Sequence, residues 1–214
     1  MSKNILIVGM GPGLSLGIAE KFGKEGFQIG MISRSEAKLA GFKMHLQSLG
    51  VNSAFAVADV SDTNQLLNAI RNIKTQIGKI DILQYNAVDA RMKFLMDETV
   101  EDLANGFKIS VGNAYAAAKE LLPDLKEAKG SILFTGGGSA NFPNPAMASI
   151  SLGKAGIKNL TYQLSQVLKP IGVFVGTVTI GGWITPESET HSPKILAEKF
   201  WELNEKRSQI EIVY

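Results

Sequence analysis

The N-terminal segment constrains the fold more than any other part of this chain. An apolar strand over residues 4–8 (NILIV) runs directly into a glycine-rich turn over residues 9–15 (GMGPGLS). A helical stretch follows, and then a second apolar run over residues 29–32 (IGMI). Gly9 lets the chain leave the strand sharply, and Gly13 lets backbone amides approach a bound anion. This order of elements is typical of a unit that holds the pyrophosphate of a dinucleotide at a helix N-terminus.

The turn therefore provides the first predicted cofactor contacts, unless it is a plain tight turn between a strand and a helix. These contacts are Gly9, Gly11, Gly13, Leu14 and Ser15.

The second strand ends at Ser33 and Arg34, and these residues distinguish between dinucleotides. An acidic side chain here would hold the ribose hydroxyls of NAD and repel a 2′-phosphate. A guanidinium pairs with that phosphate, and such a charge-assisted hydrogen bond contributes about 1.5–3 kcal/mol, or roughly a 10–150-fold preference. We therefore predict NADP as the cofactor, with NAD as the second choice. A solvated arginine in a turn is the alternative.

Strand-like and helix-like segments alternate along the whole chain, without a linker, a repeat or a low-complexity tract. The strands are nearly continuous apolar runs, as in buried parallel strands. They are predicted over residues 4–9, 28–33, 52–57, 80–85, 130–135, 172–179 and 210–213. A long helix is predicted to begin with the turns that carry Leu103 and Phe107 and to end at Pro123. We predict one domain over residues 1–214 with a Rossmann-like, doubly wound parallel sheet in a three-layer α/β/α fold, and ligands beyond the carboxyl ends of the strands.

Composition excludes several classes of protein. The formal net charge is only +2, and charges of both signs alternate, which argues against nucleic-acid or anionic-membrane binding. The absence of cysteine excludes disulfides and thiolate catalysis, and two histidines do not favour a metal site. No signal peptide or membrane-spanning apolar run is evident. We therefore expect a cytoplasmic protein that acts on a small molecule.

Two further strand ends carry residues that suit a nucleotide. Asp59 and Val60 follow the third predicted strand, and the aspartate either accepts a hydrogen bond from the adenine amine or caps the next helix. Asn86 and Ala87 close the fourth strand, where an asparagine and a small residue leave room for the cofactor. All four residues are predicted cofactor contacts.

With Leu122-Pro123, Lys154 and the segment 177–185 (TVTIGGWIT), these features resemble the short-chain dehydrogenase/reductase family over nearly the whole chain. The resemblance implies NAD(P)-dependent oxidation or reduction of an alcohol/carbonyl pair. It also implies a homodimer or homotetramer, joined through the apolar helices over residues 115–122 and 155–167. The edge strand 210–214 also invites pairing or a covering partner.

The resemblance also assigns residues at the nicotinamide end of the cofactor. Lys154 is expected to bind the nicotinamide ribose rather than transfer a proton, unless it is a solvated surface lysine. Gly181 and Trp183 are expected beside the nicotinamide, where the tryptophan either covers the ring or fills a crevice wall. The polar segment 185–193 is predicted to form a short mobile lid.

The chain departs from the family at the residues that transfer a proton. Ile150 stands at the place of the catalytic tyrosine, four residues before Lys154, and Gly137 at the place of the catalytic serine. Ser110 replaces a helix asparagine. Ser15 replaces the third glycine of the turn, where we expect its hydroxyl to bond free amides at the helix start.

Losing a placed general acid removes roughly 10²–10⁴ in rate. We assign no substitute to the other hydroxyls, since they are ordinary alcohols or, for Tyr85, predicted to point into the sheet; those considered are Thr135, Ser139, Ser149, Ser151 and Tyr85. One hypothesis is an NADP(H)-dependent oxidoreductase that acts on a small carbonyl/alcohol pair or an activated acceptor such as a quinone. The other is a non-catalytic NADP(H)-binding sensor or assembly subunit.

Overall fold

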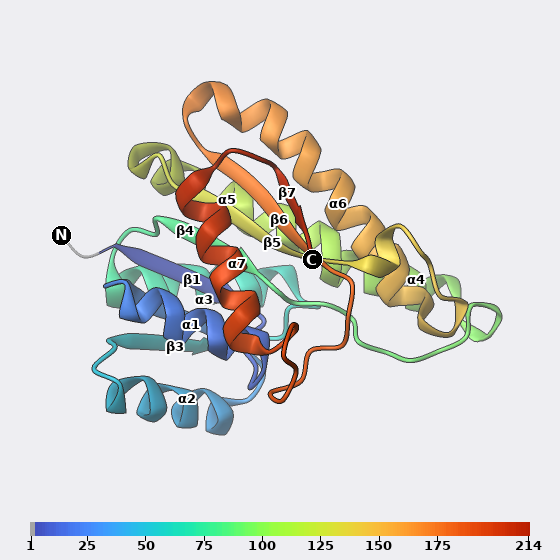
Figure 1. Ribbon diagram of the computed structural model, residues 1–214, viewed down its shortest axis with the longest axis horizontal. Coiled ribbons are helices and arrows are strands. Elements are labelled where there is room, and N and C mark those ends of the chain that lie inside the picture. The colour runs from blue at the N-terminus through green and yellow to red at the C-terminus, as the bar shows by residue number, and fades with distance from the viewer. Residues whose placement is uncertain (1–2) are drawn as a thin grey trace.

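The computed structural model describes residues 3–214, and in this range seven strands form one parallel sheet (Figure 1). The strands are β1 (Asn4–Val8), β2 (Gln28–Ser33), β3 (Ser53–Val57), β4 (Ile82–Tyr85), β5 (Ser131–Gly137), β6 (Phe174–Ile180) and β7 (Glu211–Val213). Their order in the sheet is β3-β2-β1-β4-β5-β6-β7. The strand order reverses between β1 and β4, which makes this the switch point where ligands bind in such folds. The predicted doubly wound sheet is confirmed.

Helices cover both faces of this sheet (Figure 1). One face carries α1 (Leu14–Lys24), α2 (Glu36–Ser48) and α7 (Pro193–Lys206). The other carries α3 (Thr63–Ile77), α5 (Asn113–Ala128) and α6 (Ala148–Leu168). The helix α4 (Val100–Phe107) leads into α5 through a π-helix, η2 (Lys108–Gly112). Short 3₁₀ turns are η1 (Leu95–Asp97), η3 (Gly138–Ala140), η4 (Pro145–Met147) and η5 (Lys169–Ile171).

None of the helices within residues 3–214 combines the length and the apolar character needed to cross a membrane.

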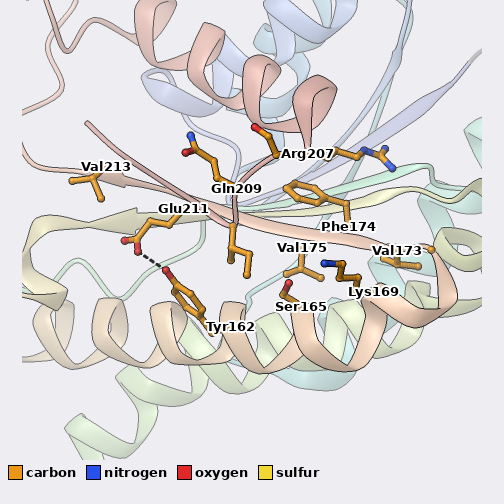
Figure 2. A pocket seen from close by; sticks show the side chains of 13 residues that line it. Tyr162, Ser165, Lys169, Val173, Phe174, Val175, Arg207, Gln209, Glu211 and Val213 are labelled. Atoms are coloured by element: carbon orange, nitrogen blue, oxygen red, sulfur yellow. Dashed lines mark hydrogen bonds between the residues drawn. The ribbon is translucent and has the colours of Figure 1, made fainter.

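A hollow of about 650 Å³ lies near the β7 edge of the sheet, between α6 and the strands β6 and β7 (Figure 2). Phe174 and Glu211, the first residues of these two strands, line it. The hydroxyl of Tyr162 on α6 donates a hydrogen bond of 2.9 Å to the carboxylate of Glu211. Because doubly wound sheets bind their ligands beyond the carboxyl ends of the strands, this hollow is not the candidate site.

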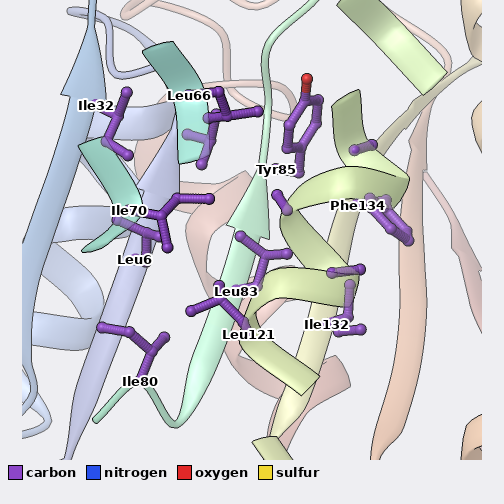
Figure 3. Packing of buried hydrophobic residues seen from close by; sticks show 14 of the residues in the cluster. Leu6, Ile32, Leu66, Ile70, Ile80, Leu83, Tyr85, Leu121, Ile132 and Phe134 are labelled. Atoms are coloured by element: carbon purple, nitrogen blue, oxygen red, sulfur yellow. The ribbon is translucent and has the colours of Figure 1, made fainter. Parts of the chain in front are cut away.

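A hydrophobic core on each face of the sheet holds the layers together. Figure 3 shows the core under α3 and α5, where Leu6, Ile32 and Leu83 of the strands pack near Ile70 and Leu121 of the helices. All five side chains are fully buried, and each contributes roughly 1.5–3 kcal/mol. Since Leu6, Ile32 and Leu83 come from β1, β2 and β4, this packing fixes the strands whose carboxyl ends form the candidate site.

The prediction that a helix ends at Pro123 is wrong, because α5 continues to Ala128. Proline inside a helix lacks one N–H and costs about 3 kcal/mol. Leu121 and Leu125, on the turns around it, are fully buried, and their burial contributes roughly 3–6 kcal/mol. The buried leucines therefore hold the helix together across an exposed proline.

Candidate functional site

Gly9 joins the ends of β1 and β4 at a spacing that no larger residue allows. Its φ angle is +89°, and a Cβ built there would lie 2.5 Å from the backbone nitrogen of Ala87. The amides of Gly9 and Met10 both donate to the carbonyl of Ile32, at 3.0 Å. The turn is therefore fixed against β2 on one side and against the end of β4 on the other.

Ser15 stabilises the same turn through two hydrogen bonds. Its hydroxyl donates to the carbonyl of Gly9 at 2.9 Å and accepts a hydrogen bond of 2.7 Å from the side-chain amide of Asn86. The prediction that Ser15 bonds free amides at the helix start is wrong. Ser15 is buried under the turn, where its hydrogen-bond partners are a carbonyl and the side-chain amide of Asn86, which follows β4.

The N-terminus of α1 is open to a ligand. Gly13 precedes the helix, no side chain caps the helix at this end, and its first turn carries no acidic residue. A Cβ built on Gly11 or on Gly13 would meet nothing within 4 Å. The uncapped amides and the partial positive charge of a helix N-terminus suit the two phosphates of a dinucleotide. The turn therefore fits the predicted cofactor.

A groove of about 570 Å³ begins at this turn and crosses the switch point between β1 and β4. Its volume is typical of a small-molecule site. Seven of the predicted contacts line it, namely Gly9, Ser33, Arg34, Asp59, Val60, Asn86 and Ala87. The sequence pattern did not identify the other lining residues, which are Met10, Ser35, Lys38, Ala58, Ser61, Val88, Asp89, Ala90, Arg91 and Ile109.

Two exposed cations, Arg34 and Lys38, line the groove near the N-terminus of α2. Ser35 caps this helix, and its hydroxyl accepts a hydrogen bond from the amide of Lys38. Lys38 lies in the first turn of α2, after the N-cap Ser35, and its charge so close to Arg34 in the sequence was the signal that could have identified it. The two side chains give this part of the groove the charge that a phosphate monoester needs.

Asp59 lines the groove, and it does not cap α3. Its carboxylate accepts a hydrogen bond of 2.9 Å from the amide of Ser61, and this bond is the main reason why the pKa of Asp59 is lowered. The cap of α3 is Asp62, which accepts hydrogen bonds from Asn64 and Gln65. The helix-cap alternative for Asp59 is therefore wrong, because the helix begins one turn later, at Thr63.

The loop after β4 is tied to α4 and α6 by a buried carboxylate, Asp89. It accepts hydrogen bonds of 2.6 Å from Arg91 and 2.8 Å from Ser149. Burial opposes the ionisation of Asp89, but these two hydrogen bonds still hold its pKa below the ordinary value. Arg91 also pairs with Asp102, at 2.9 Å. This charge network fixes one wall of the groove.

The π-helix beside the groove is held by Tyr85. Its hydroxyl donates a hydrogen bond of 2.5 Å to the carbonyl of Ile109. Tyr85 is buried, as predicted, and its hydroxyl points away from the core in Figure 3. Ser110 in the same π-helix is buried, and its hydroxyl has no partner within residues 3–214. A Cβ on Gly153 of α6 would lie 2.7 Å from that hydroxyl, so the two helices touch here.

Lys154 lies beyond the groove, at the carboxyl end of β5. Its ammonium donates a hydrogen bond of 2.7 Å to the carbonyl of Thr135, and burial lowers the pKa of Lys154 to about 8. The side chain is half-buried, so the alternative of a solvated surface lysine is wrong. A Cβ on Gly137 would lie 3.2 Å from its Cγ atom. Ile150 lies one helical turn before Lys154, in the first turn of α6.

The segment after β6 adjoins this end of the site. A Cβ on Gly138 would lie 3.3 Å from the Cα atom of Gly181, so the ends of β5 and β6 meet there. Trp183 is 79% exposed, which excludes the alternative that it fills a crevice wall. The predicted lid has no helix or strand before Pro193, and the ring of His191 packs against Gly182. Its mobility stays a prediction.

The chain is similar to known oxidoreductases in sequence and in fold. It is 28% identical to L-2,3-butanediol dehydrogenase from Corynebacterium glutamicum, over 94% of this chain and 83% of that protein. The fold matches an alcohol dehydrogenase from the archaeon Thermococcus sibiricus, solved with 5-hydroxy-NADP, at a TM-score of 0.87 and 18% identity, over 99% and 95% of the two chains. It also matches an NADPH-bound short chain oxidoreductase from Pseudomonas aeruginosa PAO1, described as containing an atypical catalytic center, at a TM-score of 0.86 and 20% identity, over the same shares.

These structures share the fold of this protein. The family model for short chain dehydrogenases matches residues 3–195, which is most of the chain. The predicted resemblance is thereby confirmed, and the protein belongs to the short chain dehydrogenase family.

Proposed function

We propose that this protein is an NADP(H)-dependent oxidoreductase of the short-chain dehydrogenase type. The observation that carries the proposal is the groove itself. It joins the glycine turn, the cations Arg34 and Lys38 and the carboxylate of Asp59 at the switch point of a doubly wound sheet. These are the donor, cation and acceptor groups that a phosphorylated dinucleotide requires. The two structural neighbours solved with NADPH and with 5-hydroxy-NADP support this choice of cofactor.

The groove and the residues that adjoin it have proposed roles toward the cofactor. The amides at the N-terminus of α1 hold the pyrophosphate, and Arg34 with Lys38 binds the 2′-phosphate. Asp59 accepts a hydrogen bond from the adenine amine, and Lys154 contacts the nicotinamide ribose beside Gly181 and Trp183. When bound, the nicotinamide supplies the hydride.

The proposed substrate is a small carbonyl/alcohol pair or an activated acceptor. Neither Ile150 nor Gly137 can donate a proton from its side chain, and a positioned acid contributes roughly 10²–10⁴ in rate. A quinone or a conjugated double bond depends less on such an acid, because hydride addition leaves a delocalised oxyanion that is far less basic than the alkoxide from a simple ketone and that water can protonate. Activated acceptors are therefore the first substrates to test.

Calorimetric titration with NADPH and with NADH tests the cofactor, and NADPH consumption with ketones, enones and quinones tests the reaction. We expect tight binding that prefers NADPH, and turnover with at least one acceptor. Absence of binding by either dinucleotide, or tight binding without turnover of any acceptor, would contradict the proposal.

A second candidate function is a non-catalytic NADP(H)-binding sensor or assembly subunit. The absence of a hydroxyl at Ile150 and at Gly137 favours it, because this groove can bind a dinucleotide without a proton relay. A sensor binds a partner protein with an affinity that changes when NADPH is added. Pull-down experiments with and without NADPH measure that change, and turnover by the purified protein excludes the sensor as the only function.

We also propose that the protein forms a homodimer or homotetramer through α5 and α6. Large apolar side chains on these helices are exposed, including Tyr115, Tyr162 and Val167. Exposed apolar residues that gather on neighbouring helices favour an interface. Light scattering coupled to size-exclusion chromatography measures the mass, and a monomer at micromolar concentration would contradict this assembly.

A further inference from the structure

Lys154 lies between Ile150 and Gly137, the two residues that stand at the places of the family's catalytic tyrosine and serine. Ile150 precedes it by one helical turn, so the two side chains share a face of α6. A Cβ built on Gly137 would lie 3.2, 3.3 and 3.4 Å from the Cγ, Cδ and Cε atoms of the lysine. The aliphatic part of Lys154 therefore runs directly along the end of β5, over the point where a serine side chain would start.

Other hydroxyl groups near this point are hydrogen-bonded elsewhere. The hydroxyls of Tyr85 and Ser149 donate to the carbonyl of Ile109 and to Asp89. The hydroxyls of Ser151 and Thr135 accept hydrogen bonds from the backbone amide of Asn144 and the side-chain amide of Gln84. The hydroxyls of Ser110, Thr135 and Ser139 are ordinary alcohols, which are weak acids without an activating partner. An ammonium group is a much stronger acid than an alcohol, which singles out Lys154 as the proton donor at this end of the site.

The ammonium of Lys154 has more hydrogen-bond donors than its contact with Thr135 uses. It carries three N–H groups, and the carbonyl of Thr135 accepts one of them at 2.7 Å. Two N–H groups therefore remain for other acceptors. Burial also brings the pKa of Lys154 to about 8, in the range where a general acid works best near neutral pH.

We propose that Lys154 is itself the general acid of the reaction, so that unactivated ketones and aldehydes are also substrates. The proposal rests on the function proposed above. In the reduction, a hydride from NADPH forms the new C–H bond, and an N–H bond of Lys154 breaks to give the new O–H bond. The carbonyl is reduced to an alcohol, NADPH is oxidised to NADP⁺, and water returns a proton to the neutral amine.

The substitution Lys154→Arg separates proton donation from charge. A guanidinium keeps the positive charge and the hydrogen-bond donors, but it does not release a proton at neutral pH. We expect the ratio of ketone turnover to quinone turnover to fall at least about 100-fold, the loss typical of a missing general acid. In the wild type, kcat/KM for ketone reduction should fall as the pH rises above about 8, because the ammonium loses its proton. This limb should disappear in the variant.

Lys158→Arg is the matched control, one turn further along α6. Lys158 bonds to Asn141 at 3.1 Å and to Glu211 at 3.2 Å, away from Gly137. We expect it to leave both the ratio and the pH limb unchanged. A readout that is independent of turnover is an NMR titration of the protein with ¹³C-labelled lysines, in which the resonance absent from Lys154→Arg should titrate near pH 8 rather than near 10.5.

Three results would overturn this role for Lys154. They are an unchanged ketone-to-quinone ratio in Lys154→Arg, a wild-type protein that reduces quinones but no ketone, and a Lys154 amine that titrates near 10.5. In each case, NADPH binding and quinone turnover by the wild type would leave the proposed oxidoreductase intact. A wild type that does not bind NADPH would overturn the proposed function and this inference together.

Discussion

Replacing Gly9 with alanine should destabilise the protein more than a glycine substitution with the same backbone strain elsewhere. Gly9 has a φ angle of +89°, and its added Cβ would lie 2.5 Å from the nitrogen of Ala87. A left-handed backbone costs a residue with a side chain roughly 1–2 kcal/mol, and overpacking costs about 1–3 kcal/mol more. The expected loss in the free energy of unfolding is therefore about 2–5 kcal/mol, or roughly 4–20 °C in Tm for a chain of this length.

Gly26→Ala provides the matched control, because Gly26 has the same φ of +89° and its Cβ would meet nothing within 4 Å. It should lose only the strain, roughly 1–2 kcal/mol. Urea unfolding of the two variants measures the difference. Equal losses would show that the contact between Gly9 and the end of β4 does not matter, and would refute the reasoning.

Other substitutions test the cofactor, the relay and the charge network. Arg34→Asp should weaken NADPH binding by roughly 10–150-fold and favour NADH, and calorimetry that finds an unchanged preference would remove Arg34 from the site. The double substitution Ile150→Tyr with Gly137→Ser should raise ketone reduction by roughly tenfold or more; no gain in steady-state assays, with NADPH still bound, would contradict the alignment of these positions with the family. A hydrogen bond from Lys93 lowers the pKa of Asp102 from 3.8 to about 2. Since the folded pKa lies below the unfolded one, the stability from Asp102 is present above pH 3.8 and is lost as the pH falls toward 2. Asp102→Asn should flatten this part of the curve of Tm against pH, and an unchanged slope would argue against the pair.

Local sequence determined the elements and their order. Apolar runs of strand length, separated by helical stripes, lead to a parallel sheet because short crossovers are right-handed and both faces need cover. The strand predicted over residues 28–33 is β2 to the residue. The glycine turn was also evident, since only a few residues in sequence define it.

Tertiary contacts decided what the polar side chains do. Ser15 bonds to Gly9 and Asn86, and Asp62 rather than Asp59 caps α3. Lys38 lines the groove and Lys154 lies against Gly137. In each case the partner comes from another element or depends on where a helix begins. Apolar periodicity does not specify these partners.

The sequence by itself therefore determined the sheet, the glycine turn and seven of the residues that line the groove. Hydrophobic periodicity and backbone permissiveness act over a few residues, so a sequence displays them directly. The tertiary structure alone decided that Pro123 stays inside a helix and that Lys154 lies against Gly137. These outcomes depend on the burial of side chains and on contacts between β5 and α6, which form only when distant segments pack together.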